Sequence, residues 1–331
     1  MRPLMRRATA QDIPQMTDLL LREVEGRQTL DPALWAVAGD ARANIARAIT
    51  ASLTPSPRAL PEFWLLAESA GRIVGLSHAM IVPPPPIYAA PGRPGLILDD
   101  SFTLAEAPEG TAQGLLAATE AALKDRGANG VIASCLEGGP WRPLFTAAGY
   151  EPVTLYMSKH GFAVGAATTA TRPASVDDIP AIVALSARHR ATLQQLNARF
   201  WTIHPEADRR FEGWMRYSLG LTDRDMIVAG RPGQTSGYVI AQPITSLHVP
   251  AGHEIAHVGI IDDFYATDFA EVVRLANHGR NAADLLAAAE QAFVRHGIQA
   301  GLVVCPAAWT SKKAFLERIG YRTAKLWMLK A

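Results

Sequence analysis

Two histidines and a glutamate stand at the spacing of a zinc-protease signature. The segment from His253 to His257 reads His-Glu-Ile-Ala-His and matches H-E-x-x-H, in which both histidines bind one zinc ion from one face of a helix. Gly252 precedes this segment and the apolar run from Val258 to Ile261 follows it, a pattern that predicts a strand. At a rise of about 3.3 Å per residue, the two rings on such a strand would lie about 13 Å apart. We therefore expect no zinc site at this motif and no bound metal.

The chain has 2 cysteines, Cys135 and Cys305, at matching places in two similar halves. One cysteine per half excludes a disulfide within a half, and two thiols are too few for a structural zinc site made of thiolates. A buried cysteine usually acts as a small apolar side chain, which is the interpretation we favour. A thiol that contacts substrate is the alternative.

Two acidic pairs, Asp99-Asp100 and Asp262-Asp263, fall within segments that read as strands, residues 95–104 and 256–265. His257 belongs to the second of these segments. Neighbouring residues of a strand face opposite sides, so at most one member of each pair is expected to point into a given site. A solvated carboxylate at the edge of a strand is the alternative for each of them.

The sequence repeats itself once, which defines the two halves. The segment Arg6–Pro14 recurs as Arg172–Pro180, and later matches follow at offsets that drift by a few residues, as loop insertions in a duplicated unit would cause. The later matches are Leu30, Trp35, Leu115, Glu120, Gly127, Cys135, Gly149, Tyr150, Met157 and Lys159 with Leu196, Trp201, Leu285, Glu290, Gly297, Cys305, Gly320, Tyr321, Met328 and Lys330. We predict two complete domains, residues 1–160 and 172–331, joined by a linker at 161–171 that is rich in small residues.

The composition is that of a globular protein. Of the 331 residues, 49% are hydrophobic and 19% are charged, so each half can bury a core of its own. The net charge of +1 lacks the basic excess expected of a nucleic-acid or anionic-membrane binder. Polar residues follow the first arginines where a signal peptide would need its apolar segment. We expect a soluble cytoplasmic protein, monomeric or homodimeric.

Each half predicts the same order of elements. A short strand leads into a capped amphipathic helix, with Thr9 or Asp12 and Ser175 or Asp177 as candidate caps. An antiparallel hairpin, the strand with the acidic pair, an amphipathic helix ending at a glycine, a buried strand, a short helix and a last strand follow. The fold class is α+β, a mixed and mostly antiparallel sheet flanked by helices, made twice.

This order resembles the GNAT superfamily of acyl-CoA-dependent N-acyltransferases. The segment Lys313–Tyr321 resembles that family's closing "YEKLGF" segment, and Leu144–Tyr150 is a weaker copy. The segments Leu98–Phe102 and Ile261–Tyr265 look like the family's fourth strand. Because these motifs come in the same order in both halves, the chain resembles a tandem GNAT protein with an architecture similar to that of mycothiol synthases.

The resemblance implies a loop before a helix that holds the pyrophosphate of acetyl-CoA, or of another acyl-CoA, with backbone N–H groups. Each half has a segment that matches the sequence pattern of that loop only in part. For both segments, an ordinary helix start without a ligand is the alternative. Glycine content favours the first loop, whereas His278 and Arg280 favour the second; Asn281 could stand there for a glycine. The candidate contacts are Gly110, Thr111, Ala112, Gln113 and Gly114 in the first half, and Gly279, Arg280, Asn281, Ala282 and Ala283 in the second.

The resemblance also implies a general base reached from the fourth strand, so the candidates are the two acidic pairs and His257. Phe145 and Leu316 occupy the position where the family often has a tyrosine that protonates the departing thiolate, and neither can donate a proton. Trp35 and Trp201 lie in the region that forms the acceptor side, where packing is the favoured role for both; Trp201 could also line a pocket.

We therefore predict an N-acetyltransferase that acylates the amine of a small molecule in one of its two copies. The alternative is a GNAT-derived protein without transferase activity that binds an acyl-CoA or a partner.

Overall fold

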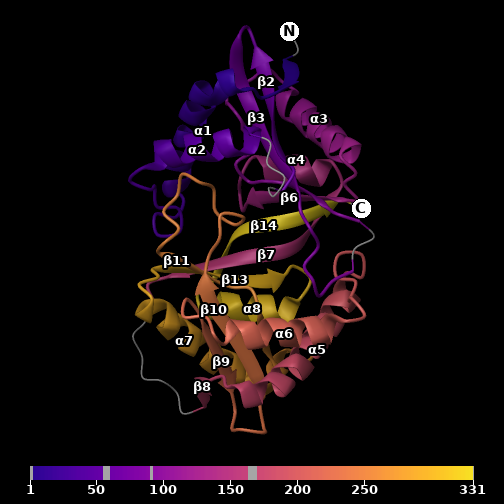
Figure 1. The fold of residues 1–331 in the computed structure, drawn as a ribbon, viewed down its shortest axis with the longest axis vertical. Coiled ribbons are helices and arrows are strands. Elements are labelled where there is room, and N and C mark those ends of the chain that lie inside the picture. Colours follow the sequence, from indigo (N-terminus) through magenta and orange to yellow (C-terminus); the bar gives the residue numbers. More distant parts are fainter. Residues whose placement is uncertain (1–2, 55–59, 90–91, 163–169, 331) are drawn as a thin grey trace.

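The computed structural model describes residues 3–54, 60–89, 92–162 and 170–330 (Figure 1). Two similar halves lie end to end along the long axis and share one mixed, mostly antiparallel sheet with helices on its faces. The α+β class predicted from the sequence is confirmed. No helix in the described ranges is both long and apolar enough to cross a bilayer.

The first half follows the predicted order of strands and helices. Its strands are β1 (Leu4–Arg7), β2 (Glu62–Ser69), β3 (Arg72–Ile81), β4 (Gly95–Ile97), β5 (Phe102–Thr103), β6 (Val131–Leu136) and β7 (Tyr150–His160). Its helices are α1 (Ile13–Gln28), α2 (Ala41–Leu53), α3 (Thr111–Asp125) and α4 (Trp141–Ala147), with a short 3₁₀ turn η1 (Ala10–Asp12) before α1.

The second half repeats this order. Its strands are β8 (Thr171–Pro173), β9 (Asp225–Ala229), β10 (Gly237–Pro243), β11 (Val258–Ile261), β12 (Phe264–Ala266), β13 (Ala300–Pro306) and β14 (Arg322–Lys330). Its helices are α5 (Ile179–Leu196), α6 (Ala207–Ser218), α7 (Arg280–Arg295) and α8 (Thr310–Arg318), with 3₁₀ turns η2 (Val176–Asp178), η3 (Thr267–Phe269) and η4 (Ala276–Gly279).

The two halves exchange their last strands. The sheet runs β1-β2-β3-β4-β6-β14-β7-β13-β11-β10-β9-β8, so β14 lies against β6 of the first half and β7 lies against β13 of the second. In Figure 1, β14 and β7 cross the middle of the molecule side by side. Each half therefore completes its sheet with a strand from the other half.

The predicted domain boundaries stay a prediction, because hydrogen bonding of the sheet continues across them. Most of the predicted linker, residues 163–169, lies outside the described residues.

The repeated N-terminal segments form matching caps. Thr9 caps η1 together with Asp12, whose carboxylate also pairs with Arg6 at 2.7 Å. Ser175 and Asp178 cap η2 in the same way, and Asp178 pairs with Arg172 at 2.6 Å. The second cap partner is thus Asp178 and not Asp177, because the reciprocal capping bond needs the third residue of the turn.

The predicted acid-bearing strand is broken in both halves. Parallel pairing of β4 with β6 ends at Ile97, and pairing of β11 with β13 ends at Ile261. The strand is interrupted at the acidic pair and resumes as β5 or β12, which among the described residues pair with the hairpin strand on the other side and not with β6 or β13. A gap between the two parallel strands results in each half.

The strand predicted at 253–257 is wrong, because these residues form a loop before β11. His253 is buried and its Nδ1 lies 3.1 Å from the carbonyl oxygen of Trp35, whereas His257 is exposed. The two rings therefore have different environments.

Candidate functional site

Each half contains a cavity at the acidic pair. Each cavity is closed on one side by a loop from the other half, which we call its roof loop. The first cavity has a volume of about 530 Å³ and includes Ser246–Gly252 of the second half. The second has a volume of about 790 Å³ and includes Pro85–Tyr88 of the first half. Backbone hydrogen bonds hold both loops, including Ala38 N–H to the Gly252 carbonyl at 3.0 Å and His204 N–H to the Ile87 carbonyl at 3.0 Å.

Both members of each acidic pair line the same cavity. Which member of each pair would face an acyl group stays a prediction, because in the first half Asp99 binds Arg27 and Lys325 whereas Asp100 binds His78. Asp99 and Asp100 lie in a turn, and Asp262 and Asp263 lie between β11 and β12.

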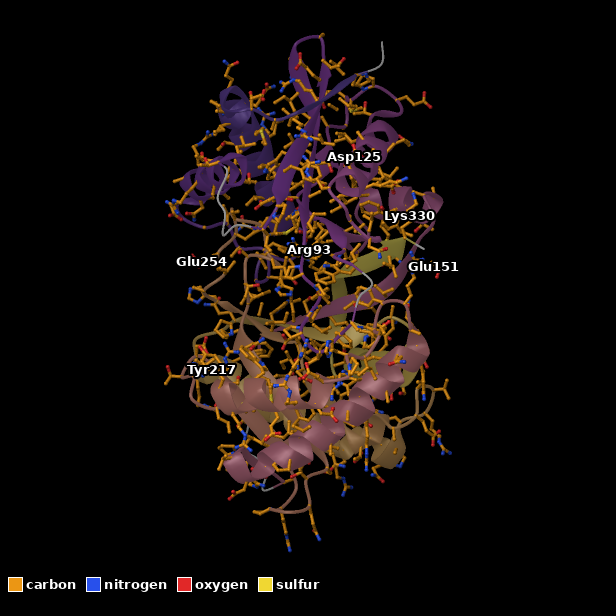
Figure 2. The ribbon with its side chains drawn as sticks, turned by 45° about the vertical axis from the view of Figure 1, so that its right-hand side comes forward. Arg93, Asp125, Glu151, Tyr217, Glu254 and Lys330 are labelled. Atoms are coloured by element: carbon orange, nitrogen blue, oxygen red, sulfur yellow. The ribbon has the colours of Figure 1, made fainter. Side chains whose placement is uncertain are left out.

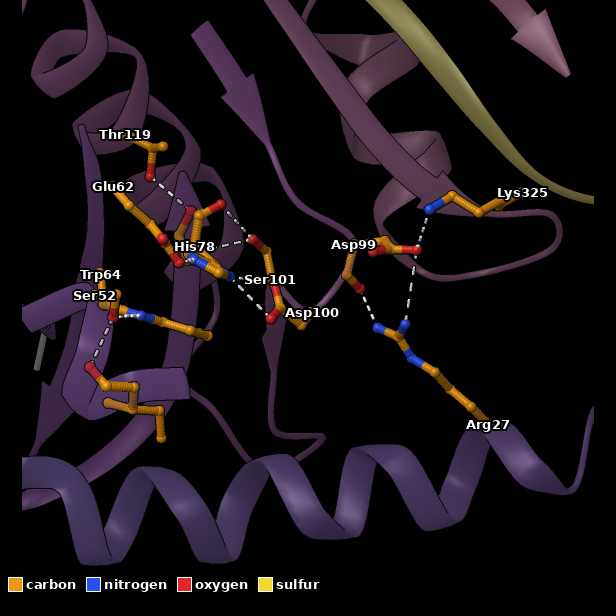
Figure 3. A network of polar contacts seen from close by, with 12 residues as sticks. Arg27, Ser52, Glu62, Trp64, His78, Asp99, Asp100, Ser101, Thr119 and Lys325 are labelled. Atoms are coloured by element: carbon orange, nitrogen blue, oxygen red, sulfur yellow. Dashed lines mark hydrogen bonds and ion pairs between the residues drawn. The ribbon is translucent and has the colours of Figure 1, made fainter. Parts of the chain in front are cut away.

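In the first cavity, Asp99 is neutralised by two cations (Figure 3). Lys325 Nζ, from the exchanged strand β14, lies 2.8 Å from its carboxylate, and Arg27 Nη1 lies 3.7 Å from it. Arg27 also donates to the backbone carbonyl of Asp99. Burial opposes ionisation, but Lys325 and Arg27 outweigh it and hold the pKa of Asp99 below its usual value. Asp99 is thus an ion-pair partner and a poor acceptor for a substrate proton.

His78 lies between two carboxylates in the same cavity (Figure 3). Its Nδ1 donates to Asp100 at 2.9 Å and its Nε2 to Glu62 at 2.5 Å. Burial alone would lower the pKa of His78, but the two carboxylates raise it to about 9. Trp64 stacks on the ring, with centroids 3.8 Å apart. The group Glu62–His78–Asp100 therefore carries one net negative charge at neutral pH.

In the second cavity, Asp262 has no cation within ion-pair distance among the described residues. Its side chain is accessible to solvent inside the cavity but is deeply enclosed by protein, and burial and the charge of Asp263 raise its pKa to about 6. Asp263 accepts a hydrogen bond from Tyr238 Oη at 2.5 Å and lies 3.9 Å from His189 Nδ1. Burial lowers the pKa of His189 to about 4, so this ring is neutral.

Two substitutions between the copies explain this difference. Leu193 takes the place of Arg27 at the offset that relates Trp35 to Trp201, and Thr154 takes the place of Lys325 at the offset that relates Tyr150 to Tyr321. Leu193 and Thr154 both line the second cavity. The same acidic pair is neutralised in one half and unpaired in the other.

The predicted phosphate loop of the first half is open. Gly110 caps α3 with a φ of 80°, and a side chain added there would meet nothing within 4 Å. Among the described residues, the N–H groups of Ala112 and Gln113 have no hydrogen-bond acceptor, as at any uncapped helix start. A groove of about 520 Å³ between α3 and α4 begins at these two residues. An anionic group could reach this helix end from solvent.

The corresponding loop of the second half is filled. Asn277, His278 and Gly279 all have left-handed backbones, with φ of 49°, 54° and 74°. Asp268 is fully buried, accepts from the Ala282 N–H at 2.9 Å and lies 3.1 Å from Asn281 Nδ2. A carboxylate of the chain therefore lies at the N-terminus of α7, where a pyrophosphate would have to bind.

Asn281 does not take the place of a glycine. It lies in the first turn of α7, and its side chain binds Asp268 instead.

Lys312 is buried against β12. This residue of α8 is fully buried, and its Nζ donates to the carbonyl of Phe264 on β12 at 2.8 Å. The rings of Phe264, Phe269 and Trp309 surround the ammonium group at 5.1 to 5.7 Å. Burial lowers the pKa of Lys312 to about 8. Trp141 stands at the matching place in the first half.

The remaining predicted residues lie outside this arrangement or have packing roles. His257 is exposed before β11, with Nδ1 3.2 Å from the Gly297 carbonyl, and it lines neither cavity. Cys135 and Cys305 are buried, and burial raises the pKa of each thiol to about 12, which favours the packing role. Trp201 lines the second cavity, whereas Trp35 is buried against His253. The described residues include no cluster of potential metal ligands.

The sequence analysis did not identify several residues that contribute to these sites. Arg27 and Lys325 are far apart in the chain and meet only because β14 is exchanged. Asp268 and Lys312 read as ordinary polar residues of a loop and a helix, and only their burial shows what they do. Comparing the copies could have drawn attention to Arg27, whose counterpart is Leu193.

Solved structures with this fold cover nearly the whole chain, although no protein-family model and no curated protein matches the sequence. A GCN5-related N-acetyltransferase from Sphaerobacter thermophilus is similar with a TM-score of 0.58 at 14% identity, over 99% of this chain and 95% of that one. A tandem GNAT protein from the clavulanic acid biosynthesis pathway is similar with a TM-score of 0.51 at 14% identity, over 98% and 97%.

A third similar structure is a glucosamine N-acetyltransferase region in a fungal multi-domain GH3 beta-N-acetylglucosaminidase. Its TM-score is 0.53 at 14% identity, over 98% of this chain and 38% of that one. Two GNAT-like units in one chain, joined in a shared sheet, are thus seen in the element order and matched by these structures. The chain has the fold of a tandem GNAT protein.

Proposed function

We propose that the protein is an acyl-CoA-dependent N-acyltransferase whose active site is in the first half, with acetyl-CoA as the donor and the amine of a small molecule as the acceptor. One observation carries the choice of half: the helix start and groove at Gly110–Gln113 are open, whereas Asp268 fills the corresponding helix start in the second half. The neighbouring structures named as N-acetyltransferases support the reaction class.

The residues of the first half suit the two ends of the donor. The free N–H groups of Ala112 and Gln113 and the dipole of α3 would hold the pyrophosphate. The groove between α3 and α4 would hold the rest of the carrier, and the gap between β4 and β6 would admit the thioester to the acidic pair.

The cavity on the other side of that gap suits an amine. Asp100 and Glu62 carry more negative charge than His78 compensates, so they favour binding of an ammonium group. A proton must leave that group before nitrogen can attack a thioester carbonyl, and a carboxylate within reach can accept it. Phe145 cannot protonate the departing thiolate, but a thiol pKa near 8.5 makes an unassisted departure feasible.

Titration calorimetry with acetyl-CoA and with coenzyme A tests the location of the donor. We expect one site per chain, and we expect Ala112→Glu to weaken acetyl-CoA binding about tenfold or more, because it adds a carboxylate beside the pyrophosphate at a helix position that tolerates glutamate. Arg280→Glu places a carboxylate in the first turn of α7 in the second half and should leave the affinity unchanged. Loss of binding in Arg280→Glu alone would place the donor in the second half.

The second candidate is a protein that binds acyl-CoA without transferring the acyl group, and the double ion pair of Asp99 favours it. Release of free thiol from acetyl-CoA across a panel of primary amines separates the two. Binding without thiol release above the buffer rate for every amine would favour the second candidate.

A further inference from the structure

The cavity of the second half is larger than that of the first, about 790 Å³ against 530 Å³, although Asp268 occupies the N-terminus of α7 beside it. Its lining is largely apolar and aromatic. It includes Trp201 and Phe211 together with Ile87 and Tyr88 of the roof loop. Asp262 and Asp263 also line the cavity, and we call this acidic part of the lining the floor. A cavity of this size and composition is suited to a small organic ligand.

The floor is anionic because its neighbours do not neutralise it. The two arginines of the wall are already paired, Arg190 with Asp208 and Arg210 with Glu206, while Asp262 has no cation partner in the described part of the chain. Arg224 is near enough to act on the charge of Asp262 but donates to Gln242 and Asp223. A ligand cation would supply the missing charge.

A second feature also points to a ligand. His189 lines the cavity, is only 8% exposed, and its Nε2 has no hydrogen-bond partner among the described residues. A buried polar atom without a partner is costly unless something else binds it. The neutral ring can offer Nε2 as an acceptor or a donor.

The mouth of the cavity carries exposed aromatic side chains. Trp214 and Tyr217 lie one turn apart on α6, with ring centroids 5.6 Å apart, and are 46% and 62% exposed. Figure 2 shows Tyr217 at the outer surface of the second half. The Arg224 guanidinium already lies 5.7 Å from the centroid of the Trp214 ring, so Tyr217 is the ring at the entrance that can attract a ligand cation.

An amine that reached this floor could not be acylated there. The start of α7, where a pyrophosphate would bind, is taken by Asp268, and Lys312 is buried against β12. The features of an acceptor cavity are present without access for a donor.

We propose that the second cavity is a separate ligand site, which binds an organic cation with an apolar or aromatic body and holds it unreacted. This goes beyond the proposed function, since acyl transfer is assigned to the other half.

Benzyltrimethylammonium is a suitable probe because its quaternary nitrogen has no proton to lose and cannot be acylated. Calorimetric titration of the full chain should show one site for this cation and at least about tenfold weaker binding of uncharged benzyl alcohol. Equal binding of both compounds, or binding of neither, would overturn the proposal.

Two variants locate the site independently. Asp262→Asn removes charge from the floor, and Leu193→Arg places a cation where the first half has Arg27; each should weaken probe binding by about tenfold or more. Asp177→Asn, an exposed change outside the cavity, is the control and should bind like the unaltered protein. Circular dichroism checks that each variant is folded. Unchanged affinity in both cavity variants would overturn the assignment.

Titrating acetyl-CoA into the same samples separates this proposal from the proposed function. Acetyl-CoA binding that survives in Asp262→Asn while probe binding is lost supports two separate sites. Probe binding that is lost with acetyl-CoA binding in Ala112→Glu would refute the second site. Failure of acetyl-CoA to bind any sample would refute the proposed function alone.

Discussion

The chemistry of a carboxylate in this fold depends on which side chains surround it. Asp99 and Asp262 occupy equivalent places, yet the pKa of Asp99 is held below its usual value by Lys325 and Arg27, whereas burial and Asp263 raise that of Asp262 to about 6. The duplicated fold therefore supplies an internal comparison. One carboxylate is fixed in an ion pair, and the other is free to meet a ligand.

Asp100→Asn tests whether the first cavity carries the reaction. We expect turnover with a verified amine to fall about 100-fold or more, with acetyl-CoA affinity nearly unchanged, because the amide accepts no proton and no longer attracts the ammonium group. Steady-state kinetics and calorimetry measure the two effects. Glu25→Gln, an exposed change on α1 outside the cavity, is the control. Near-normal turnover in Asp100→Asn, with a large loss in Asp262→Asn, would move the active site to the second half.

At the residue scale the sequence predicted where the acidic pairs would lie in the fold but not their environments. The predicted strands are interrupted at Asp99-Asp100 and Asp262-Asp263, and no glycine or proline at these positions indicates the interruption. Burial of Asp268 and Lys312 depends on contacts with distant segments. Such contacts cannot be read from local spacing.

At the element scale, the residues that survive in both copies hold the exchanged strands. Lys330 on β14 reaches Glu120 on α3 at 2.8 Å, and Glu120 also accepts from Tyr150 Oη at 2.7 Å. In the other half, Lys159 on β7 binds Glu290 at 2.8 Å. Figure 2 labels Lys330 near the end of β14. These residues, which match between the two halves of the sequence, thus form the ion pairs that bind the exchanged strands.

A double-mutant cycle compares the strengths of the ion pairs Lys330–Glu120 and Lys159–Glu290. The second pair is the more enclosed, with side chains 24% and 10% exposed against 36% and 23% for the first. We expect a coupling energy of about 1–2 kcal/mol for Lys159→Met with Glu290→Gln, and less than about 1 kcal/mol for Lys330→Met with Glu120→Gln, since water screens exposed pairs. Urea unfolding measures both. A larger coupling at the more exposed pair would contradict this account.

Elements governed by local chemistry were predicted well. The turn between β2 and β3 uses Ala70 and Gly71 at positive φ, and Gly127 and Gly297 follow α3 and α7 with φ of 80° and 72°, as the glycine signals indicated. The order of the strands in the sheet could not be predicted from local sequence patterns. The sequences of β6 and β13 indicate buried strands but not which strand lies beside each of them.

At the scale of the whole molecule, strands and loops are both exchanged between the halves. The roof of the first cavity comes from Ser246–Gly252 and that of the second from Pro85–Tyr88, so neither cavity is complete in an isolated half. Because β7 lies between β13 and β14, separating the halves would also expose unpaired strand edges. The two copies form one structural unit.

A protease site inserted within residues 161–171 tests whether the two halves of the full chain form one folded unit. After cleavage, we expect the two fragments to elute together and to unfold in one transition, because β7 is paired with β13 from Thr154 to His160 and with β14 on its other edge. Size-exclusion chromatography and scanning calorimetry measure this. Leu326→Asp, which places a charge at a buried position of β14, should weaken the association of the cleaved fragments. If the fragments of the unaltered chain instead separated into two folded monomers, each half would hold its own last strand in solution, and neither cavity would need a roof from the other half.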